Sequence, residues 1–257
     1  MSIKKVASII LNRNLPIPTD NLYEHLKKYD EYHSDFFVVE SGSDYKNLSK
    51  HYTWHANSEE AMEHGLRYSR GMNYGLVKLL EANKFDDYDA FFLLCNDVEL
   101  PNSSTLLPLL ELFNEYPRLG IISPCSQNWG ELSLLNDRGT LCFWFIHSNA
   151  YLIRKEFIQS ICNFKEPNFM NFLFDGNNFR GYGLEHEIIA KGYINNWASA
   201  ITNKVIISEN ENYLLNQSDL IKTEPFHENL KLYLKEGKTW MLNKYGFRSH
   251  WAMQQYS

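Results

Sequence analysis

The sequence lacks the patterns that mark several common protein classes. Its four cysteines contain no C-x-x-C pair, so they fit neither a zinc site nor a disulfide framework. No uninterrupted apolar segment is long enough to cross a bilayer. Internal repeats and low-complexity tracts are also missing. The 25 Lys and Arg residues are outnumbered by 31 Asp and Glu, which gives a net charge of −6, and we therefore expect no nucleic-acid partner.

Glycine-rich phosphate loops are absent as well. No G-x-G-x-x-G follows the first predicted strand, and no G-x-x-x-x-G-K-[ST] occurs anywhere. The segment after that strand, residues 11–16, reads LNRNLP and contains no glycine. These absences exclude the usual dinucleotide-binding and P-loop signatures. They also argue against a sugar nucleotidyltransferase, which needs a glycine-rich loop at this position.

Strand and helix patterns alternate in the first half of the chain. Apolar runs predict strands buried on both faces, and apolar stripes at helical spacing predict helices between them. The predicted strands are 6–11, 36–39, 90–95 and 120–123, and the predicted helices are 21–32, capped by Asp20, 68–82, and 106–113, capped by Ser103 or Ser104. This alternation predicts a parallel sheet with crossover helices.

The second half of the chain is less regular. Residues 143–153 are rich in strand formers, 155–162 have a helical pattern, and 163–183 form an aromatic, Asn- and Gly-rich loop. A late strand is predicted at 205–207 and a final helix at 228–244. No convincing linker divides the chain, and we therefore expect one mixed α/β domain over residues 1–257.

The most informative segment is the apolar run 90–95, which is followed by Asn96-Asp97-Val98-Glu99. In an open α/β sheet, ligands gather at the carboxyl ends of such buried strands. Carboxylate oxygens placed there suit Mg²⁺ or Mn²⁺, which usually share their coordination sphere with substrate phosphates. The segment therefore suggests a metal–diphosphate site. The alternative is a strand followed by an ordinary polar turn.

Seven segments match, in order, the motifs of one enzyme family. They are VVESGSD (38–44), RYSRGMNYG (67–75), LLCNDVEL (93–100), GIISP (120–124), FD (174–175), YGLEHEI (182–188) and KYG (244–246). Together they resemble family 2 glycosyltransferases of the GT-A fold, especially the rhamnosyltransferase-like branch of bacterial polysaccharide enzymes. The resemblance implies a mixed, mostly parallel sheet flanked by helices. It also implies a nucleotide-binding half at 1–125, and an acceptor-binding half with a C-terminal helix at 126–257.

The resemblance implies a metal-dependent, inverting hexosyltransferase. Such an enzyme moves a sugar from a UDP- or dTDP-sugar to a glycan or lipid-linked saccharide acceptor of a growing polysaccharide. Mn²⁺ or Mg²⁺ on Asp97 is expected to act as a Lewis acid for the leaving diphosphate. Glu99 is a candidate second ligand. The remaining ligand is open between His227, just before the last predicted helix, and Glu209, after the late strand.

Two acidic residues near the start of the YGLEHEI segment are candidates for the general base. Glu185 falls at the position of the family's presumed catalytic Asp, and Glu187 is the reserve. Three aromatic neighbours, Phe179, Tyr182 and Trp197, are expected to raise the pKa of Glu185 by desolvation. One base acting on the acceptor, with no candidate covalent nucleophile, implies inversion at the anomeric carbon.

Five residues are predicted to bind the nucleotide sugar. Asn12 and Arg13 follow the first strand, where Arg13 is placed to pair with phosphate, although a surface Arg is the alternative. Glu40 is placed by the resemblance to contact the nucleotide base, and the alternative is a turn acid bonded to its own backbone. Arg70 is expected near the diphosphate. Asn96 is expected in the same site, beside the metal motif.

Two positions depart from the family pattern. Cys95 replaces the first member of the metal motif, and Leu184 replaces a Glu that precedes the presumed base. These departures favour the competing hypothesis of a catalytically impaired GT-A-like domain that binds nucleotide or glycan without turnover.

Aromatic and basic side chains suggest further contacts. Candidates for a sugar-stacking wall, or otherwise for core positions, are Trp129, Trp144, Tyr182 and Trp197. Candidates for docking on an anionic membrane, or otherwise for a solvated helix face, are Lys235, Lys238, Lys244, Arg248 and Trp251. The N-terminus leads directly into a strand pattern without the apolar core of a signal peptide. We therefore expect a cytoplasmic protein with at most peripheral contact to the inner face of the membrane.

Overall fold

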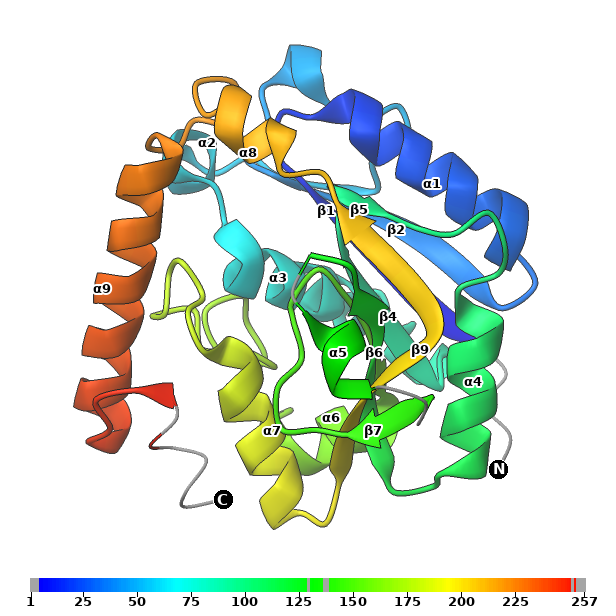
Figure 1. Ribbon diagram of the computed structural model, residues 1–257. Coiled ribbons are helices and arrows are strands. Elements are labelled where there is room, and N and C mark those ends of the chain that lie inside the picture. The colour runs from blue at the N-terminus through cyan, green and yellow to red at the C-terminus, as the bar shows by residue number, and fades with distance from the viewer. Residues whose placement is uncertain (1–4, 129, 136–138, 251, 253–257) are drawn as a thin grey trace.

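A nine-stranded sheet forms the centre of the computed structural model, which describes residues 5–128, 130–135, 139–250 and 252 (Figure 1). Trp129 and Trp251 therefore lie outside the described residues. The strands are β1 (Val6–Asn12), β2 (Ser34–Ser41), β3 (Trp54–Ala56), β4 (Ala90–Cys95), β5 (Val98–Glu99), β6 (Leu119–Ser126), β7 (Thr140–Cys142), β8 (Ala150–Arg154) and β9 (Ala198–Glu209). Their order is β3-β2-β1-β4-β8-β6-β9-β5, and β7 also pairs with β9.

The sheet is mixed, and most of its strands share one direction. Parallel pairs join β1 to β2 and to β4, β2 to β3, and β6 to β9. β8 runs antiparallel to both β4 and β6, so that β4 and β6 again point the same way. Because β8 inserts between strands of the first half, the two halves of the chain share one sheet. The separate roles predicted for these halves stay a prediction.

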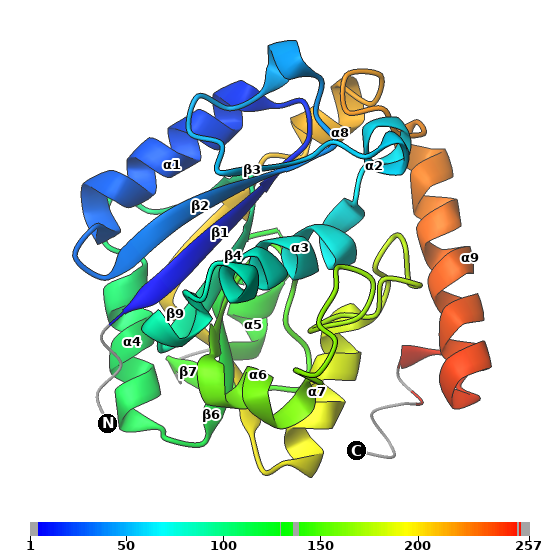
Figure 2. The same ribbon diagram turned by 180° about the vertical axis from the view of Figure 1, so that it is seen from behind.

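Helices cover both faces of the sheet (Figures 1 and 2). The helices are α1 (Pro16–Asp30), α2 (Glu59–His64), α3 (Arg67–Glu81), α4 (Leu106–Glu115), α5 (Glu131–Leu135), α6 (Lys155–Ile161), α7 (Leu184–Ile194), α8 (Asn212–Asn216) and α9 (Phe226–Tyr245). One hydrophobic cluster unites α1 and α4 with one face, and another unites α3, α6 and α7 with the opposite face. Within the described chain, no helix combines the length and apolar content that a membrane span requires.

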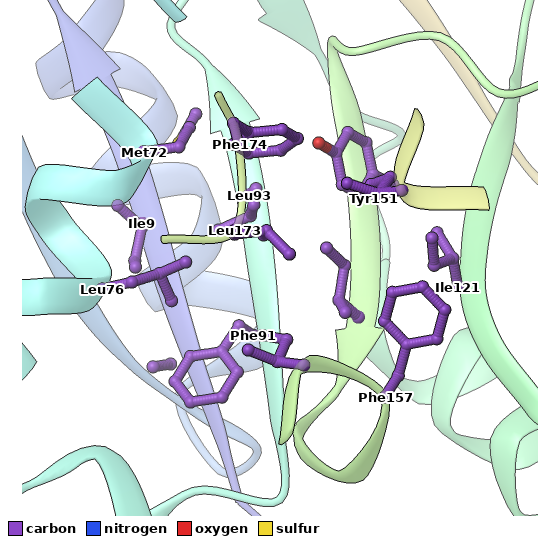
Figure 3. Close-up of a cluster of buried hydrophobic side chains, with 14 of the residues drawn as sticks. Ile9, Met72, Leu76, Phe91, Leu93, Ile121, Tyr151, Phe157, Leu173 and Phe174 are labelled. Carbon is purple, nitrogen blue, oxygen red and sulfur yellow. The ribbon is translucent and has the colours of Figure 1, made fainter. Parts of the chain in front are cut away.

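The hydrophobic cluster between α3 and the sheet shows why this helix packs closely on the strands (Figure 3). Met72 and Leu76 from α3 meet Ile9 of β1, and all three side chains are fully buried. Burying such a side chain stabilises a fold by about 1.5–3 kcal/mol. Gly71 and Gly75 line the same helix face: a Cβ atom at Gly75 would lie 2.9 Å from Ile9 Cγ2. Because Gly71 and Gly75 carry no side chain, this face of α3 lies directly on the strands.

The predicted strands and the long helices of the first half are confirmed, with one shifted boundary. α1 begins at Pro16, and not at residue 21, with Pro at its first turn, where the missing N–H costs nothing. Asp20 therefore lies inside α1, and its carboxylate accepts hydrogen bonds from Ser49 Oγ (2.5 Å) and the Lys50 amide (3.1 Å). The predicted cap at Asp20 is wrong. Ser104 does accept a bond from Leu107 N (3.0 Å) at the start of α4.

Residues 163–183 form a loop, as predicted, and one buried side chain organises it. Asn73 donates to the carbonyls of Phe169 (3.0 Å) and Phe174 (2.8 Å). Its Oδ1 accepts from the amides of Leu173 and Phe174, both at 3.0 Å. A single carboxamide on α3 thus satisfies backbone groups that no ladder pairs. It fixes the loop that leads into α7.

Candidate active site

The carboxyl ends of β1, β4 and β9 lie at one edge of the sheet, together with the amino end of β5. β1 and β4 run in register, with Leu11 opposite Cys95. β5 pairs with the end of β9, which places Val98 opposite Glu209. Two separate polar segments, after β4 and at the end of β9, are therefore brought together here, at the kind of edge where open α/β sheets bind ligands.

Asp97 and Glu209 form the acidic centre of this edge. The Asn210 amide donates to the Asp97 carbonyl (2.9 Å), which ties the two segments together. Oδ1 of Asp97 is buried and has no hydrogen-bond partner among the described residues. Burial, followed by the charge of Glu209, raises the pKa of Asp97 to about 7. An uncompensated carboxylate of this kind is a favourable place for a cation.

Glu185 approaches the same centre from the other side. It lies in the first turn of α7, only 7% exposed, and lines a cavity of about 330 Å³ together with Glu209, Ser148 and Tyr233. Burial raises the pKa of Glu185 to about 7, although a hydrogen bond with Ser148 acts in the opposite direction. The predicted rise is confirmed. The desolvating neighbours differ from those expected, because the cavity is lined mainly by residues 145–149 and α9.

Cys95 lies where the three carboxylates converge. Burial raises the pKa of its thiol well above the ordinary value, and Asp97, Glu209 and Glu185 raise it further, in that order. The thiol therefore stays protonated at neutral pH and supplies no anionic sulfur ligand. The metal motif thus keeps Asp97 as its carboxylate and loses the contribution of its first position.

The residues present fit a divalent cation with few protein ligands. In the described part of the chain, no three His, Cys, Asp or Glu side chains lie close enough to form a complete metal cage. Mg²⁺-type sites commonly use one or two carboxylates and leave the remaining positions to water and phosphate. Asp97 and Glu209 meet that description, because an orphaned carboxylate oxygen lies beside a second acid.

Neither of the other two predicted ligands offers a buried, unpartnered oxygen like that of Asp97, although Glu99 lines the same cavity. Glu99 is exposed, and its oxygens accept hydrogen bonds from Ser208 (3.1 Å) and Asn210 (3.2 Å). His227 is exposed in the first turn of α9, with its ring against Phe226. Of the two alternatives for the remaining ligand, Glu209 is therefore the one that the fold places beside Asp97.

Asn12, Glu40 and Asn96 form a buried network. Both oxygens of Glu40 accept from Asn12 Nδ2, at 3.0 and 2.9 Å, and Glu40 has no exposed surface. Ser43 Oγ and the Ser49 amide supply two further donors to the same carboxylate. Asn96 donates to Asn12 Oδ1 (2.8 Å) and lines a second cavity, of about 220 Å³, with Asp97. Glu40 thus accepts hydrogen bonds within the turn after β2, as the alternative of a turn acid expected. Its contact to a nucleotide base stays a prediction.

The guanidinium of Arg13 is occupied by backbone carbonyls. It donates to Ser41 O, Ala61 O, Glu63 O and Ile221 O, at 2.7–3.1 Å. Burial, followed by the charge of Arg67, lowers the pKa of Arg13 to about 10. Arg13 thus joins the ends of β1 and β2 to a distant segment. Its predicted pairing with phosphate stays a prediction.

That distant segment, residues 217–224, is here called the strap. It connects α8 to α9 and lies beside α2 in both views (Figures 1 and 2). Asn14 Nδ2 donates to Leu220 O (2.8 Å), and Lys222 Nζ pairs with Asp44 (2.6 Å). The strap therefore covers the loops that follow β1 and β2. Sequence patterns gave no sign of it.

Glu187 holds α9 in place. Its Oε1 accepts from Lys244 Nζ (2.9 Å), Tyr245 Oη (2.5 Å) and Lys191 Nζ (2.9 Å). Lys244 also pairs with Asp175 (2.5 Å), which links the 163–183 loop to the same helix. Of the two predicted acids, Glu185 lines the cavity with Glu209, whereas Glu187 lies in this anchoring network.

Replacing Asp175 by Asn is expected to lower the free energy of unfolding at neutral pH by about 1–2 kcal/mol. Burial disfavours the charged form, but hydrogen bonds from Lys244 and Trp240 outweigh it and lower the pKa of Asp175 to about 2. A carboxylate whose pKa falls on folding stabilises the fold above its unfolded pKa, about 3.9, and this contribution is lost as the pH falls towards 2.

Urea unfolding at pH 7 and at about pH 2.5 measures this contribution. The difference between wild type and Asp175→Asn should shrink to less than half at the lower pH. Asp86→Asn is the control, because that side chain is 83% exposed beside Lys155. A difference of the same size at both pH values would show that the carboxylate charge of Asp175 contributes nothing.

Of the two alternatives for these aromatic residues, the structure favours the core position for Trp197. Trp197 lies at the start of β9, at the opposite edge of the sheet from Glu209, where it donates to Ser160 Oγ (3.0 Å) and packs on Phe157. Trp144 packs with His186 (5.7 Å between ring centroids), and Tyr182 Oη bonds His250 (2.5 Å).

Residues 147–149 line the cavity with Glu185 but were predicted as part of a strand. β8 begins only at Ala150, and His147-Ser148-Asn149 precede it in a loop. Three polar residues in a row within an apolar stretch are the signal that marks this break.

His147 Nε2 lies 3.6 Å from Glu131, yet burial lowers the pKa of His147 to about 4 and raises that of Glu131 to about 7. Burial outweighs pairing here, and the two groups favour their uncharged forms.

No protein-family model matches the sequence, and no curated protein matches it with significance. Solved structures do match it. The mannosyltransferase PcManGT from Pyrobaculum calidifontis, solved with GDP-Man and Mn²⁺, has a TM-score of 0.57 at 12% identity, over 80% of this chain and 57% of that one. GalNAc-T7, solved with UDP, GalNAc and Mn²⁺, has a TM-score of 0.58 at 10% identity, over 80% and 44%. Glucosyl-3-phosphoglycerate synthase from Mycobacterium tuberculosis, solved with Mn²⁺, UDP-glucose and phosphoglyceric acid, has 0.56 at 12%, over 93% and 79%.

These matches establish the fold. The chain has the mixed α/β architecture of GT-A nucleotide-sugar transferases, as predicted. It spans less than two thirds of the length of the first two structures.

Proposed function

We propose that this protein is a metal-dependent glycosyltransferase that uses a nucleotide sugar as donor. The observation that carries the proposal is the buried, unpartnered oxygen of Asp97 beside Glu209, at the carboxyl edge of a GT-A sheet. The three structural neighbours described above were each solved with Mn²⁺ and a nucleotide or nucleotide sugar, which supports the same chemistry here. A UDP- or dTDP-sugar is the proposed donor.

Asp97 and Glu209 are the proposed ligands of Mn²⁺ or Mg²⁺. Bound there, the cation would neutralise the charge that develops on the leaving diphosphate. Glu99 and His227 have no ligand role in this proposal. Asn12 and Glu40 position the loop after β2, and Asn96 positions the segment that carries Asp97.

Glu185 is the proposed general base. Its carboxylate lines the cavity that it shares with Glu209, so an acceptor hydroxyl bound in this cavity would lie close to the base and to the proposed metal ligand. The buried position raises the pKa of Glu185 to about 7, which suits proton removal at neutral pH. Since one carboxylate takes the acceptor proton and no nucleophile faces the donor in this proposal, transfer proceeds with inversion. The family resemblance supports a saccharide acceptor of a growing polysaccharide.

A thermal-shift screen of UDP-, dTDP- and GDP-sugars, each with and without Mn²⁺, tests the proposal. A ligand that binds the native state raises the melting temperature by mass action. We expect at least one nucleotide to raise it only when Mn²⁺ is present. If no nucleotide shifts the melting temperature in either condition, the transferase proposal loses its support.

A second candidate function is a GT-A-like domain that binds nucleotide or glycan without turnover. The protonated thiol of Cys95, at the first position of the metal motif, is the observation that favours it. Release of UDP from UDP-sugars separates the two functions. Metal-dependent nucleotide binding without release, for any donor and acceptor, would favour the binding domain.

A further inference from the structure

Three arginines converge on one aromatic ring away from Asp97. The guanidinium carbons of Arg70, Arg67 and Arg180 lie 4.9, 5.4 and 5.7 Å from the centroid of Phe179. With Lys222 they line a pocket of about 350 Å³ between α2, the start of α3 and the strap. Carboxylates from the chain itself now balance these cations: Glu60 pairs with Arg70 (2.8 Å), and Glu224 and Glu236 pair with Arg180.

Arg67 has unused hydrogen-bonding capacity in this pocket. Its Nε is buried and has no partner in the part of the chain that the structure describes. Its backbone adopts a φ of 55°, which is uncommon for a residue with a side chain. Arg67 also begins α3, whose N-terminus has no side-chain cap and carries the positive end of the helix dipole. The unpartnered Nε and the helix N-terminus both favour an anion.

Glu224 on the strap already occupies the pocket as an internal anion. One of its oxygens pairs with Arg180 (2.5 Å) and the other with Arg67 (3.3 Å). The Glu224 side chain is 36% exposed, so it lies at the mouth of the pocket. A carboxylate held by two guanidinium groups imitates the way arginines hold phosphate.

The pocket is separate from the Asp97 centre and adjoins the cavity of Glu185. Among the described residues, none that lines the arginine pocket also lines the cavity of Asp97 or the cavity of Glu185 and Glu209. A diphosphate bound through a cation on Asp97 and Glu209 would lie at those cavities. Arg180 Nε, however, donates to Asn229 Oδ1 (3.2 Å), and Asn229 lines the cavity that holds Glu185. The pocket thus borders the acceptor side.

We propose that the arginine pocket binds a phosphate group of the acceptor, which displaces Glu224 from Arg67 and Arg180. The acceptor is therefore a phosphorylated molecule. This assignment to an acceptor rests on the proposed transferase function. Arg70, predicted to meet the donor diphosphate, is reassigned to the acceptor. Release of Glu224 removes one attachment of the strap, whereas the hydrogen bonds from Arg13 and Asn14 remain.

Isothermal titration with inorganic phosphate tests the pocket through substitutions of opposite effect. Arg67→Gln should weaken phosphate binding by about tenfold or more, since it removes a charged donor. Glu224→Gln should tighten binding by about threefold or more, because the competing carboxylate is gone. Glu228→Gln, an exposed α9 residue that pairs with Lys231, should leave the affinity unchanged.

The Glu224 variant keeps the test independent of misfolding, because a damaged fold does not gain affinity. Phosphate binding that is undetectable in wild type and Glu224→Gln, or equal in wild type and Arg67→Gln, overturns the proposal. A repeat titration with saturating UDP and Mn²⁺ identifies the source of the phosphate. An unchanged phosphate affinity supports the proposal that the pocket binds a phosphate of the acceptor. Competition by UDP would assign the pocket to the donor diphosphate and overturn the proposal. UDP binding is measured separately in this series. If UDP does not bind but phosphate does, the transferase function fails while the phosphate pocket stands.

Discussion

Asp97→Ala is expected to weaken Mn²⁺ binding by about 100-fold or more and to abolish metal-dependent UDP binding. The reason is geometric: Asp97 supplies a buried oxygen with no protein partner, and Glu209 beside it cannot hold the cation alone. The electron paramagnetic resonance signal of free Mn²⁺ measures the bound fraction directly. In wild type with UDP the signal should fall as the cation is taken up, and in the variant it should not.

Glu99→Ala is the matched control for that experiment. Glu99 lies two residues from Asp97, but it is exposed and bonded to Ser208 and Asn210. Its removal should leave Mn²⁺ uptake within about twofold of wild type. If Asp97→Ala takes up Mn²⁺ as well as Glu99→Ala does, the cation site lies elsewhere. Equal loss in both variants would restore Glu99 as a ligand.

Glu185→Gln is expected to lower the rate of sugar transfer by about 10²–10⁴-fold while UDP binding stays within about twofold of wild type. Glutamine keeps the shape of the buried side chain and removes its ability to accept the acceptor proton. Release of UDP in the presence of acceptor measures transfer, and calorimetry measures binding. The described lining of the cavity contains no Lys or Arg, so the substitution breaks no ion pair with such a residue there.

Glu187→Gln provides the contrast on the same helix. Glu187 accepts from Lys244, Tyr245 and Lys191, so this variant should melt at a lower temperature but transfer sugar at a near-normal rate while folded. Normal transfer by Glu185→Gln, together with loss in Glu187→Gln, would exchange the two assignments. Normal transfer by both variants would remove this helix from the chemistry.

Much of the fold follows from local patterns. The apolar runs of β1, β2 and β4 are buried on both faces, and a run of that kind is legible without tertiary information. The start of α1 was misplaced because Pro16 and Pro18 read as loop residues, although prolines suit the first turn of a helix. β3 was missed because it has only three residues and depends on pairing with β2.

The candidate site was predictable where a motif follows a long strand, as at Asp97. Glu209 was harder to place, because β9 extends over twelve residues and its pattern is broken by Asn203 and Lys204. Only the full length of β9 brings Glu209 opposite Val98, and that pairing is the reason for proposing Glu209, and not His227, as the second ligand. A register across strands distant in sequence is a tertiary fact that local periodicity does not encode.

The arginine pocket could not be predicted from the sequence for a related reason. Arg180 lies in a loop whose course is set by Asn73 on α3, through four hydrogen bonds to backbone groups. Glu224 belongs to the strap, which Arg13 and Asn14 hold from more than 200 residues away in sequence. Side chains that organise irregular backbone leave no periodic signal, so their partners emerge only from the three-dimensional structure.

The central claim is that the edge of the sheet at Asp97 binds a nucleotide diphosphate through a divalent cation. Calorimetric titration of the wild-type protein with UDP, first in Mn²⁺ and then in excess EDTA, tests it most directly. We predict binding in Mn²⁺ that weakens by about tenfold or more in EDTA and returns when Mn²⁺ is restored. Equal affinity in both conditions, or no binding in either, would contradict the claim.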